Sequence, residues 1–172
     1  MKVAVLSDVH DNIWNLKSLI KKLESSKIEA TIFCGDLIAP STAAILATLN
    51  TPIHCCLGNN DEDHIGMLKM GGEMINWTHL SKEFGEIVLD GRKIAFCHYP
   101  KLGELLAKSG DYDAVFYGHT HQKENKIIGK TLLVNPGAVC GFSGSNDIIP
   151  TYAIYDTRTN ESTMMKINNK KE

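Results

Sequence analysis

The stretch VAVLSDVHDNIWNLKSLIKKL, residues 3–23, decides the fold. Its first five residues, VAVLS, form a short apolar run of the kind that makes a buried strand. From about Asn12 the apolar positions follow a helical spacing and fall on one helix face: Ile13, Leu16, Leu19, Ile20 and Leu23. A buried strand followed by an amphipathic helix is one β–α unit, so the sequence predicts an α/β fold.

The same unit recurs along the chain. TIFCGD (31–36) precedes a helix near 41–49, PIHCCLG (52–58) precedes a helix near 60–69, and IAFCH (94–98) precedes a helix at 101–109 and the run AVFYGH (114–119). The segment EIVLDGRKIAF (86–96) carries a hairpin signal at Asp90-Gly91. Shorter strands are expected near 124–128, 131–134, 151–156 and 162–167. We expect two packed sheets with helices outside, in one domain spanning 1–172.

Composition and net charge exclude several classes of function. A chain of 172 residues that is 43% apolar can bury a core without metal or disulfide staples. A net charge of −2 gives no basic surface, so sequence-general nucleic-acid binding is not expected. The N-terminus does not resemble a signal peptide, and no apolar run reaches the roughly 18 residues of a membrane span, so we expect a cytoplasmic protein without membrane association. The five cysteines are expected to be buried, reduced thiols.

Metal-binding residue types stand where five of the apolar runs end. These residues are Asp8, His10, Asp36, Asn59, His98, His119 and His121. The carboxyl ends of parallel strands meet at one sheet edge, and residues i and i+2 of an extended segment point the same way, so we expect the seven side chains to converge. Imidazoles mixed with carboxylates suit manganese, iron, nickel, cobalt or zinc, and seven donors exceed what one ion needs. The sequence therefore predicts two divalent transition-metal ions.

Asp8-x-His10, Gly35-Asp36, Gly58-Asn59, His98 and Gly118-His119-x-His121 together resemble the motif series of the calcineurin-like metallophosphoesterases, in particular their small bacterial and archaeal phosphodiesterases. Asn135-Pro136-Gly137 strengthens the likeness. The resemblance implies a four-layer αββα sandwich with two central mixed sheets flanked by helices. It implies one metal held by Asp8, His10 and His121, a second held by Asn59, His98 and His119, and Asp36 bridging both, with manganese the first expectation.

The expected function is that of a binuclear-metal phosphodiesterase, in which a metal-bridging water or hydroxide attacks a small phosphodiester substrate. Many members of the family carry His where this chain has Asn60, and an amide cannot deliver a proton near neutral pH. We therefore expect a preference for good leaving groups, as in aryl or nucleotide diesters. His64 is either a substitute acid or a surface histidine. Asp61 is expected to cap the following helix or to support a ligand rather than to react.

Three questions stay open in the sequence. The alternative to an enzyme is a catalytically weak protein of the same fold that serves as a protein-interaction scaffold, and homo-oligomerisation is undecided. Met67, Leu68, Met70 and Met74 are assigned to the core, with an apolar lid or subunit contact as the alternative. His54 and His79 are expected to be structural.

Overall fold

The computed structural model describes residues 1–78 and 82–167, which form two mixed sheets and four α-helices. The first sheet has the order β13-β12-β1-β2-β3-β4, with bounds Glu161–Lys166, Thr151–Asp156, Lys2–Leu6, Ala30–Cys34, Ile53–Cys56 and Ile75–Trp77. The second has the order β5-β6-β7-β9-β8, with bounds Phe84–Leu89, Arg92–Cys97, Ala114–Phe116, Thr131–Asn135 and Glu124–Ile128. A small hairpin, β10 (Phe142–Ser143) with β11 (Asn146–Asp147), stands apart from both.

Strand directions bring the strand ends to one edge of the sandwich. In the first sheet β1, β2, β3 and β4 run parallel, β12 pairs antiparallel with β1, and β13 pairs antiparallel with β12. In the second sheet β6, β7 and β9 run parallel, and β5 and β8 pair antiparallel at the two margins. The carboxyl ends of β1, β2, β3, β6 and β7 therefore supply the loops of one site.

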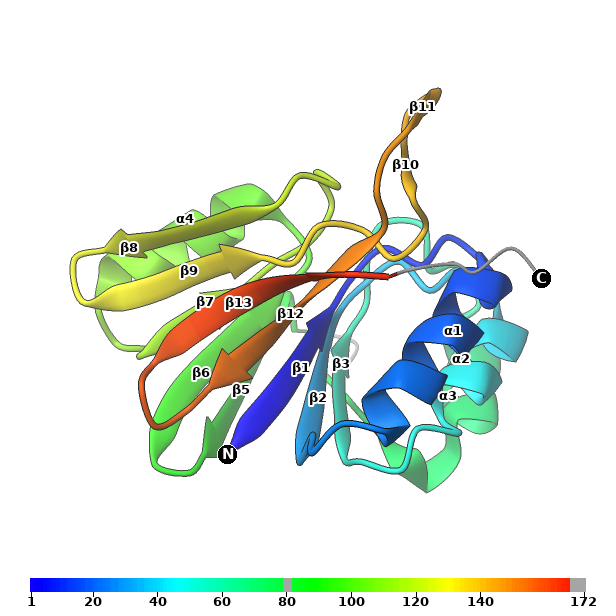
Figure 1. Cartoon of the computed structure of the whole chain (residues 1–172), viewed down its shortest axis with the longest axis horizontal. Coiled ribbons are helices and arrows are strands. Elements are labelled where there is room, and N and C mark those ends of the chain that lie inside the picture. The colour runs from blue at the N-terminus through cyan, green and yellow to red at the C-terminus, as the bar shows by residue number, and fades with distance from the viewer. Residues whose placement is uncertain (79–81, 168–172) are drawn as a thin grey trace.

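The helices cover the two outer faces, which gives the four layers α/β/β/α (Figure 1). Helices α1 (Ile13–Glu24), α2 (Pro40–Leu46) and α3 (His64–Gly71) lie on the first sheet, and α4 (Pro100–Ser109) lies on the second. Three apolar layers result. The middle one packs the two sheets directly on each other through side chains such as Val5, Ile32, Phe96 and Phe116. The four-layer sandwich expected from the sequence is confirmed.

Local sequence explains where the main helices begin and end. The Asn12 side chain accepts a hydrogen bond from the backbone N–H of Asn15 and so caps α1, whose buried face carries Leu16, Leu19 and Leu23. Pro100 lies in the first turn of α4, which ends at Gly110 in the left-handed conformation. The hairpin expected at Asp90-Gly91 joins β5 to β6, and both turn residues have positive φ, as a two-residue hairpin of this type requires.

The sequence-based prediction was wrong in several places. The third helix begins at His64 rather than near residue 60, because Asp63 caps it by accepting from Gly66 N–H and residues 58–61 are held in the loop. Strands β4, β10 and β11 were not expected. Of the four residues assigned to the core around α3, only Met67 is fully buried; Leu68, Met70 and Met74 are 37%, 52% and 43% exposed.

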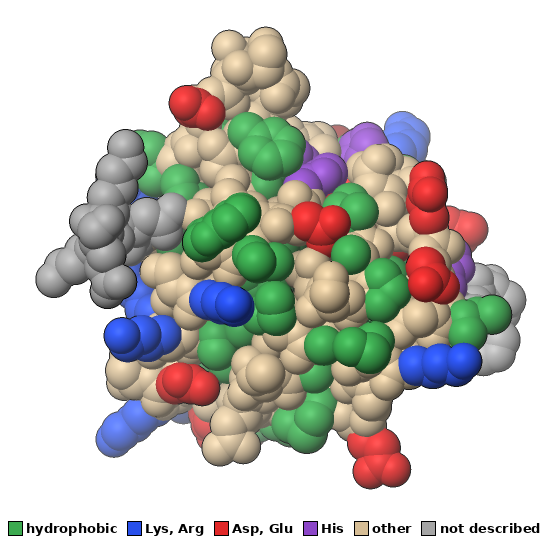
Figure 2. Space-filling view, turned by 90° about the vertical axis from the view of Figure 1, so that its right-hand side faces the viewer, with side chains coloured by type: hydrophobic (Ala, Val, Ile, Leu, Met, Phe, Trp, Pro, Cys, Tyr) green, Lys and Arg blue, Asp and Glu red, His purple; other side chains and the backbone are tan. Residues whose placement is uncertain are grey.

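Figure 2 shows exposed hydrophobic side chains spread over the face formed by α1–α3, with histidines near its upper rim. His54 is half-buried in β3, and all five cysteines are buried and free. His79 lies outside the described residues. Among the residues that the structure describes, no helix combines the length and apolar character needed to cross a membrane.

Candidate metal centre

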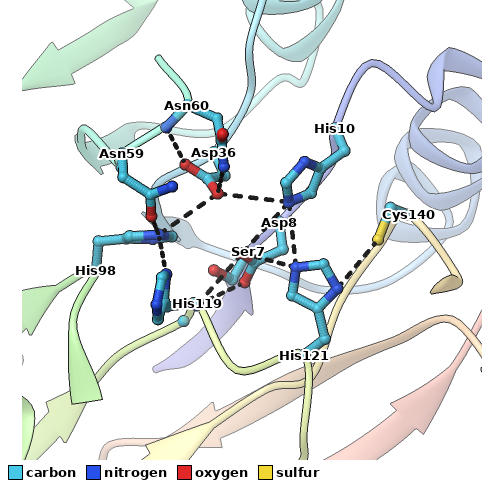
Figure 3. Close-up of polar contacts among 12 residues, drawn as sticks. Ser7, Asp8, His10, Asp36, Asn59, Asn60, His98, His119, His121 and Cys140 are labelled. Atoms are coloured by element: carbon cyan, nitrogen blue, oxygen red, sulfur yellow. Dashed lines mark hydrogen bonds and ion pairs between the residues drawn. The ribbon is translucent and has the colours of Figure 1, made fainter. Parts of the chain in front are cut away.

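All seven metal-binding residues predicted from the sequence lie together at the carboxyl edge of the two sheets, with side chains pointing toward one another (Figure 3). The loops after β1, β2 and β3 carry Asp8, His10, Asp36 and Asn59. The loops after β6 and β7 carry His98, His119 and His121. The centre is therefore shared between the two sheets, one half from each.

One cluster consists of Asp8, His10 and His121. His10 Nε2 lies 3.1 Å from His121 Nε2, and His121 Nε2 lies 3.3 Å from Asp8 Oδ1. His10 Nε2 is 3.8 Å from the same carboxylate oxygen. Asp8 itself is completely buried, and the backbone N–H of His119 donates to its other oxygen, Oδ2, at 3.0 Å. These three donor atoms are close enough to hold a single ion.

A second cluster gathers around His98. Its Nε2 lies 3.0 Å from Asn59 Oδ1 and 3.2 Å from His119 Nδ1. Asp36 stands between the clusters, because its Oδ2 is 3.4 Å from His10 Nε2 in the first and 3.5 Å from His98 Nε2 in the second. The groupings that the resemblance implied thus coincide with neighbours in space.

The donor spacings fit coordination to metal ions. With metal–ligand bonds of about 2.1 Å, neighbouring ligands are about 3.0 Å apart in an octahedron and about 3.4 Å apart in a tetrahedron. The contacts within the two clusters run from 3.0 to 3.5 Å, apart from the longer one between His10 and Asp8. Four imidazole nitrogens, two carboxylates and an amide oxygen crowded at these distances are the donor set that transition-metal ions bind.

Outer contacts orient two of the imidazoles toward the centre. His98 Nδ1 donates to the backbone carbonyl of Cys34 at 2.8 Å, and His121 Nδ1 donates to the carbonyl of Phe142. A carbonyl can only accept, so each Nδ1 carries the hydrogen and, in the neutral ring, the lone pair is on the inward-facing Nε2. The Phe142 contact was missed because a backbone carbonyl leaves no signal in the sequence. The Cys140 thiol, 3.7 Å from His121 Nδ1, had been assigned with the other cysteines to the buried thiols.

The residues converge at the predicted sheet edge, but the second part of the argument was wrong, namely that residues i and i+2 point the same way because their segments are extended. Segments 8–10 and 119–121 are not extended: Asp8, His10, His119 and His121 have φ of 56°, 45°, 71° and 58°, and Asp36 has φ of 63°. Left-handed backbone is uncommon for residues other than glycine, and its clustering is a feature of functional sites. The side chains are aimed by a sharp turn after each strand rather than by the alternation of a strand.

Glycines allow the loops to approach the carboxylates closely. A Cβ on Gly118 would lie 1.9 Å from Ser7 Oγ and 2.8 Å from Asp8 Oδ2, and a Cβ on Gly58 would lie 2.2 Å from Asp36 Oδ1. Any side chain at either position would displace a carboxylate of the centre. The glycines before Asn59 and His119 are therefore required by space.

Asn60 and Asp61 act on the loops rather than on an open cavity. Asn60 donates to Asp36 twice, from its backbone N–H to Oδ1 at 2.9 Å and from its side-chain amide to Oδ2 at 2.7 Å. The buried Asp61 carboxylate accepts three backbone N–H groups: those of Asp36 and Gly58 on Oδ2 and that of Ile38 on Oδ1. Of the two roles expected for Asp61, the structure shows support of a ligand loop; Asp63 is the helix cap.

Burial and the neighbouring histidines have opposite effects on the pKa values of the two carboxylates in the centre. Burial alone would raise the pKa of Asp8, but hydrogen bonds with His10 and His121 outweigh it and hold that pKa well below its ordinary value. Asp36 behaves likewise, with His98 lowering its pKa against the effect of burial. In turn the Asp8 carboxylate, with Cys140, raises the pKa of His121 to about 11. Two buried carboxylates thus require positive charge beside them, which protons or divalent cations can supply.

His64 is set apart from the seven donors. It begins α3 and lines a small pocket together with Gly58 and Tyr99, and it makes no hydrogen bond with the seven donors among the described residues. Its role as an acid stays a prediction, as does any contact of Asn60 with a substrate.

Comparisons with known proteins identify the family and related folds. The family model of the calcineurin-like phosphoesterase superfamily domain matches residues 1–160. A phosphodiesterase of Methanocaldococcus jannaschii is 33% identical over 163 residues, covering 94% of this chain and 96% of the relative. The structure of an archaeal phosphodiesterase superposes with a TM-score of 0.86 at 29% identity, over 96% of this chain and 99% of the other. Vps29 from Entamoeba histolytica, complexed with zinc, gives a TM-score of 0.69 at 20% identity over 98% and 100% of the two chains, a likeness of fold.

Proposed function

The chain belongs to the calcineurin-like phosphoesterase superfamily and is a metal-dependent phosphodiester hydrolase, and we propose that it works with two divalent ions on small aryl or nucleotide diesters. The observation that carries the proposal is the position of Asp36, whose Oδ2 lies 3.4 Å from a donor of one cluster and 3.5 Å from a donor of the other. One carboxylate between two donor sets is the arrangement that a pair of ions shares.

Each ligand has a proposed place. Asp8, His10 and His121 would hold the first ion, Asn59, His98 and His119 would hold the second, and Asp36 would contribute to both. The nitrogen and oxygen donors suit manganese first, with nickel, iron, cobalt or zinc as alternatives. We propose a single domain over 1–172 and a cytoplasmic location.

The ions, when bound, supply a water of lowered pKa for attack on phosphorus and positive charge for the phosphoryl oxygens. The residues of the chain hold and aim this centre: His98 and His121 are oriented by the carbonyls of Cys34 and Phe142, and Asn60 fixes both oxygens of Asp36. The Asn60 amide is committed to Asp36 and cannot deliver a proton near neutral pH. Substrates whose leaving oxygen needs no protonation, such as aryl diesters, are therefore favoured.

The test combines metal analysis with turnover. Purified protein, stripped with a chelator and reconstituted with Mn²⁺, is expected to bind two ions per chain and to hydrolyse bis(4-nitrophenyl) phosphate with a higher kcat/KM than an alkyl phosphomonoester. Stripped protein is expected to be inactive. One ion per chain at full activity would contradict the binuclear centre, and a preference for the alkyl monoester would contradict the argument from Asn60.

A protein-interaction scaffold is the second candidate. The exposed apolar side chains of α3, Ile65, Leu68 and Met70, favour a contact surface on this face. The presence of all seven donors at coordination distances favours the enzyme. A scaffold would show neither stoichiometric metal nor turnover in the experiment above, so the same measurement separates the two.

A further inference from the structure

A pocket of about 120 Å³ opens beside the metal centre, on the side of the second cluster. It is lined by Leu57, Gly58, His64, Lys82, Glu83 and Tyr99, among other residues. Two of these adjoin proposed ligands in the sequence, since Gly58 precedes Asn59 and Tyr99 follows His98. The pocket therefore lies next to residues proposed to hold the second ion, and Tyr99 contacts the rings of two of them, His98 and His119.

Tyr99 is the main aromatic wall of this pocket. Its ring centre lies 5.2 Å from the ring of His98 and 5.4 Å from that of His119, and 37% of the residue is exposed. One side of the ring is thus packed against the imidazoles of the centre, while part of it faces solvent at the pocket. Its hydroxyl makes no hydrogen bond with any described residue, so no hydrogen bond of that hydroxyl fixes the position of the ring.

Resting on the proposed function, we propose that this pocket is a subsite for one ester group of the substrate and that Tyr99 selects a planar six-membered ring there, such as a phenyl group or a pyrimidine base. The size is of the right order, because an enclosed cavity of about 150 Å³ binds benzene and this pocket of about 120 Å³ is open at a mouth where Lys82 and Glu83 are exposed.

The charged side chains at the pocket favour a ring with polar edges over a second anion. Lys82 can donate hydrogen bonds and Glu83 can accept them, and both are exposed at the mouth. Their charges cancel, so the pocket offers no net attraction for a further phosphate. Donor and acceptor together match the edge of a base, while the apolar Leu57 and Tyr99 take its faces.

The experiment measures binding of two non-hydrolysable ligands to the Mn²⁺-loaded protein by calorimetry. Phenylphosphonate and methylphosphonate present the same charged group to the ions and differ only in the ring. In the wild type, phenylphosphonate is expected to bind about tenfold more tightly, within the range that stacking of a base on an aromatic side chain gives. Tyr99→Ala is expected to bring the two Kd values within about twofold of each other, and Tyr99→Phe is expected to keep the preference.

Two further variants guard the interpretation. Tyr99→Leu keeps apolar packing against the imidazoles without a planar ring, and it is expected to lose the preference as Tyr99→Ala does. Leu105→Ala removes an exposed apolar side chain from the following helix, away from the pocket, and is expected to leave the ratio of the two Kd values unchanged.

Several results would overturn the subsite. These are equal Kd values in the wild type, a preference that survives Tyr99→Ala, or an equal weakening of both ligands, which would mean that Tyr99 acts through the placement of His98 and His119. A fall in bound Mn²⁺ in Tyr99→Ala would carry the same meaning. Failure of both phosphonates to bind the loaded wild type, together with no turnover, would instead overturn the proposed function itself.

Discussion

Removing the Asp61 carboxylate should destabilise the loops that carry the metal centre. Asp61 is 4% exposed and accepts three backbone N–H groups, from Asp36 at 2.9 Å, Gly58 at 2.7 Å and Ile38 at 2.8 Å. In Asp61→Ala all three donors lose their partner, at a cost of about 1–3 kcal/mol for each buried group. Because the variant also removes a buried charge, which offsets part of that cost, we expect a loss of about 3–5 kcal/mol in the free energy of unfolding.

Asp61→Asn should be milder for a reason that the contacts specify. Its amide oxygen can replace Oδ2, which accepts from both Asp36 and Gly58, but its NH₂ group then faces the N–H of Ile38. One hydrogen bond is lost and two donors confront each other, so a loss of about 1.5–3 kcal/mol is expected. Asp63→Ala is the matched control. It deletes a carboxylate two residues away that caps α3, and it should cost about 1 kcal/mol.

The assay is urea unfolding of chelator-treated protein, followed by Mn²⁺ binding and turnover of bis(4-nitrophenyl) phosphate for each variant that folds. The expected order of stability is wild type, Asp63→Ala, Asp61→Asn, Asp61→Ala, with Mn²⁺ affinity reduced only in the two Asp61 variants. Equal destabilisation by Asp61→Ala and Asp63→Ala would refute the reasoning, because it would mean that the three N–H groups find other partners.

Three further predictions follow from the geometry. His119→Ala should lower kcat/KM by more than the ~100-fold cost of losing a residue that only hydrogen-bonds to a metal ligand. The urea midpoint of the metal-free protein should be nearly unchanged, and a large fall in that midpoint would indicate a structural site. Gly118→Ala should lower the free energy of unfolding by about 1–3 kcal/mol and weaken Mn²⁺ binding measured by calorimetry, because the new Cβ would lie 2.8 Å from Asp8 Oδ2. Unchanged Mn²⁺ binding would contradict the close approach of Gly118 to Asp8. Burial alone would raise the pKa of Asp113, but hydrogen bonds from the Lys93 N–H and from Arg92 outweigh it and lower that pKa. The ionised Asp113 therefore stabilises the fold above pH 3.8, and this stabilisation is lost as the pH falls further. Asp113→Asn should flatten the acidic part of the curve of stability against pH, and an unchanged curve would contradict this role for Asp113.

The fold was readable from the sequence because its signals are local and agree with one another. Apolar runs such as VAVLS and the helical spacing of Leu16, Leu19 and Leu23 are buried as expected. The failures lie where a neighbour in space decides. Strand β4 is only three residues long and is defined by its pairing with β3, and the exposed residues of α3 have the same composition as a buried helix.

Less of the site than of the fold could be predicted from the sequence. Residue types at strand ends located all seven proposed ligands, but neither the left-handed backbone at five of them nor the carbonyls of Cys34 and Phe142 could be predicted. Aspartate and histidine adopt positive φ only when surrounding contacts hold them there. Those contacts come from residues distant in sequence, such as the Asp8 N–H donating to Gly35 O and the His10 N–H donating to Asp36 O.

The division of the centre between two sheets gives the middle apolar layer a role in function. Asp8 and Asp36 leave the first sheet and His98 and His121 leave the second, yet His121 Nε2 lies 3.3 Å from Asp8 and His98 Nε2 lies 3.5 Å from Asp36. These contacts cross from sheet to sheet, as does the hydrogen bond from His98 to Cys34 O. The distance between the half-sites is therefore set by side chains such as Phe96 and Phe116 that separate the sheets. Because close-packed interiors yield little, the core holds the two sets of donors at coordination spacing.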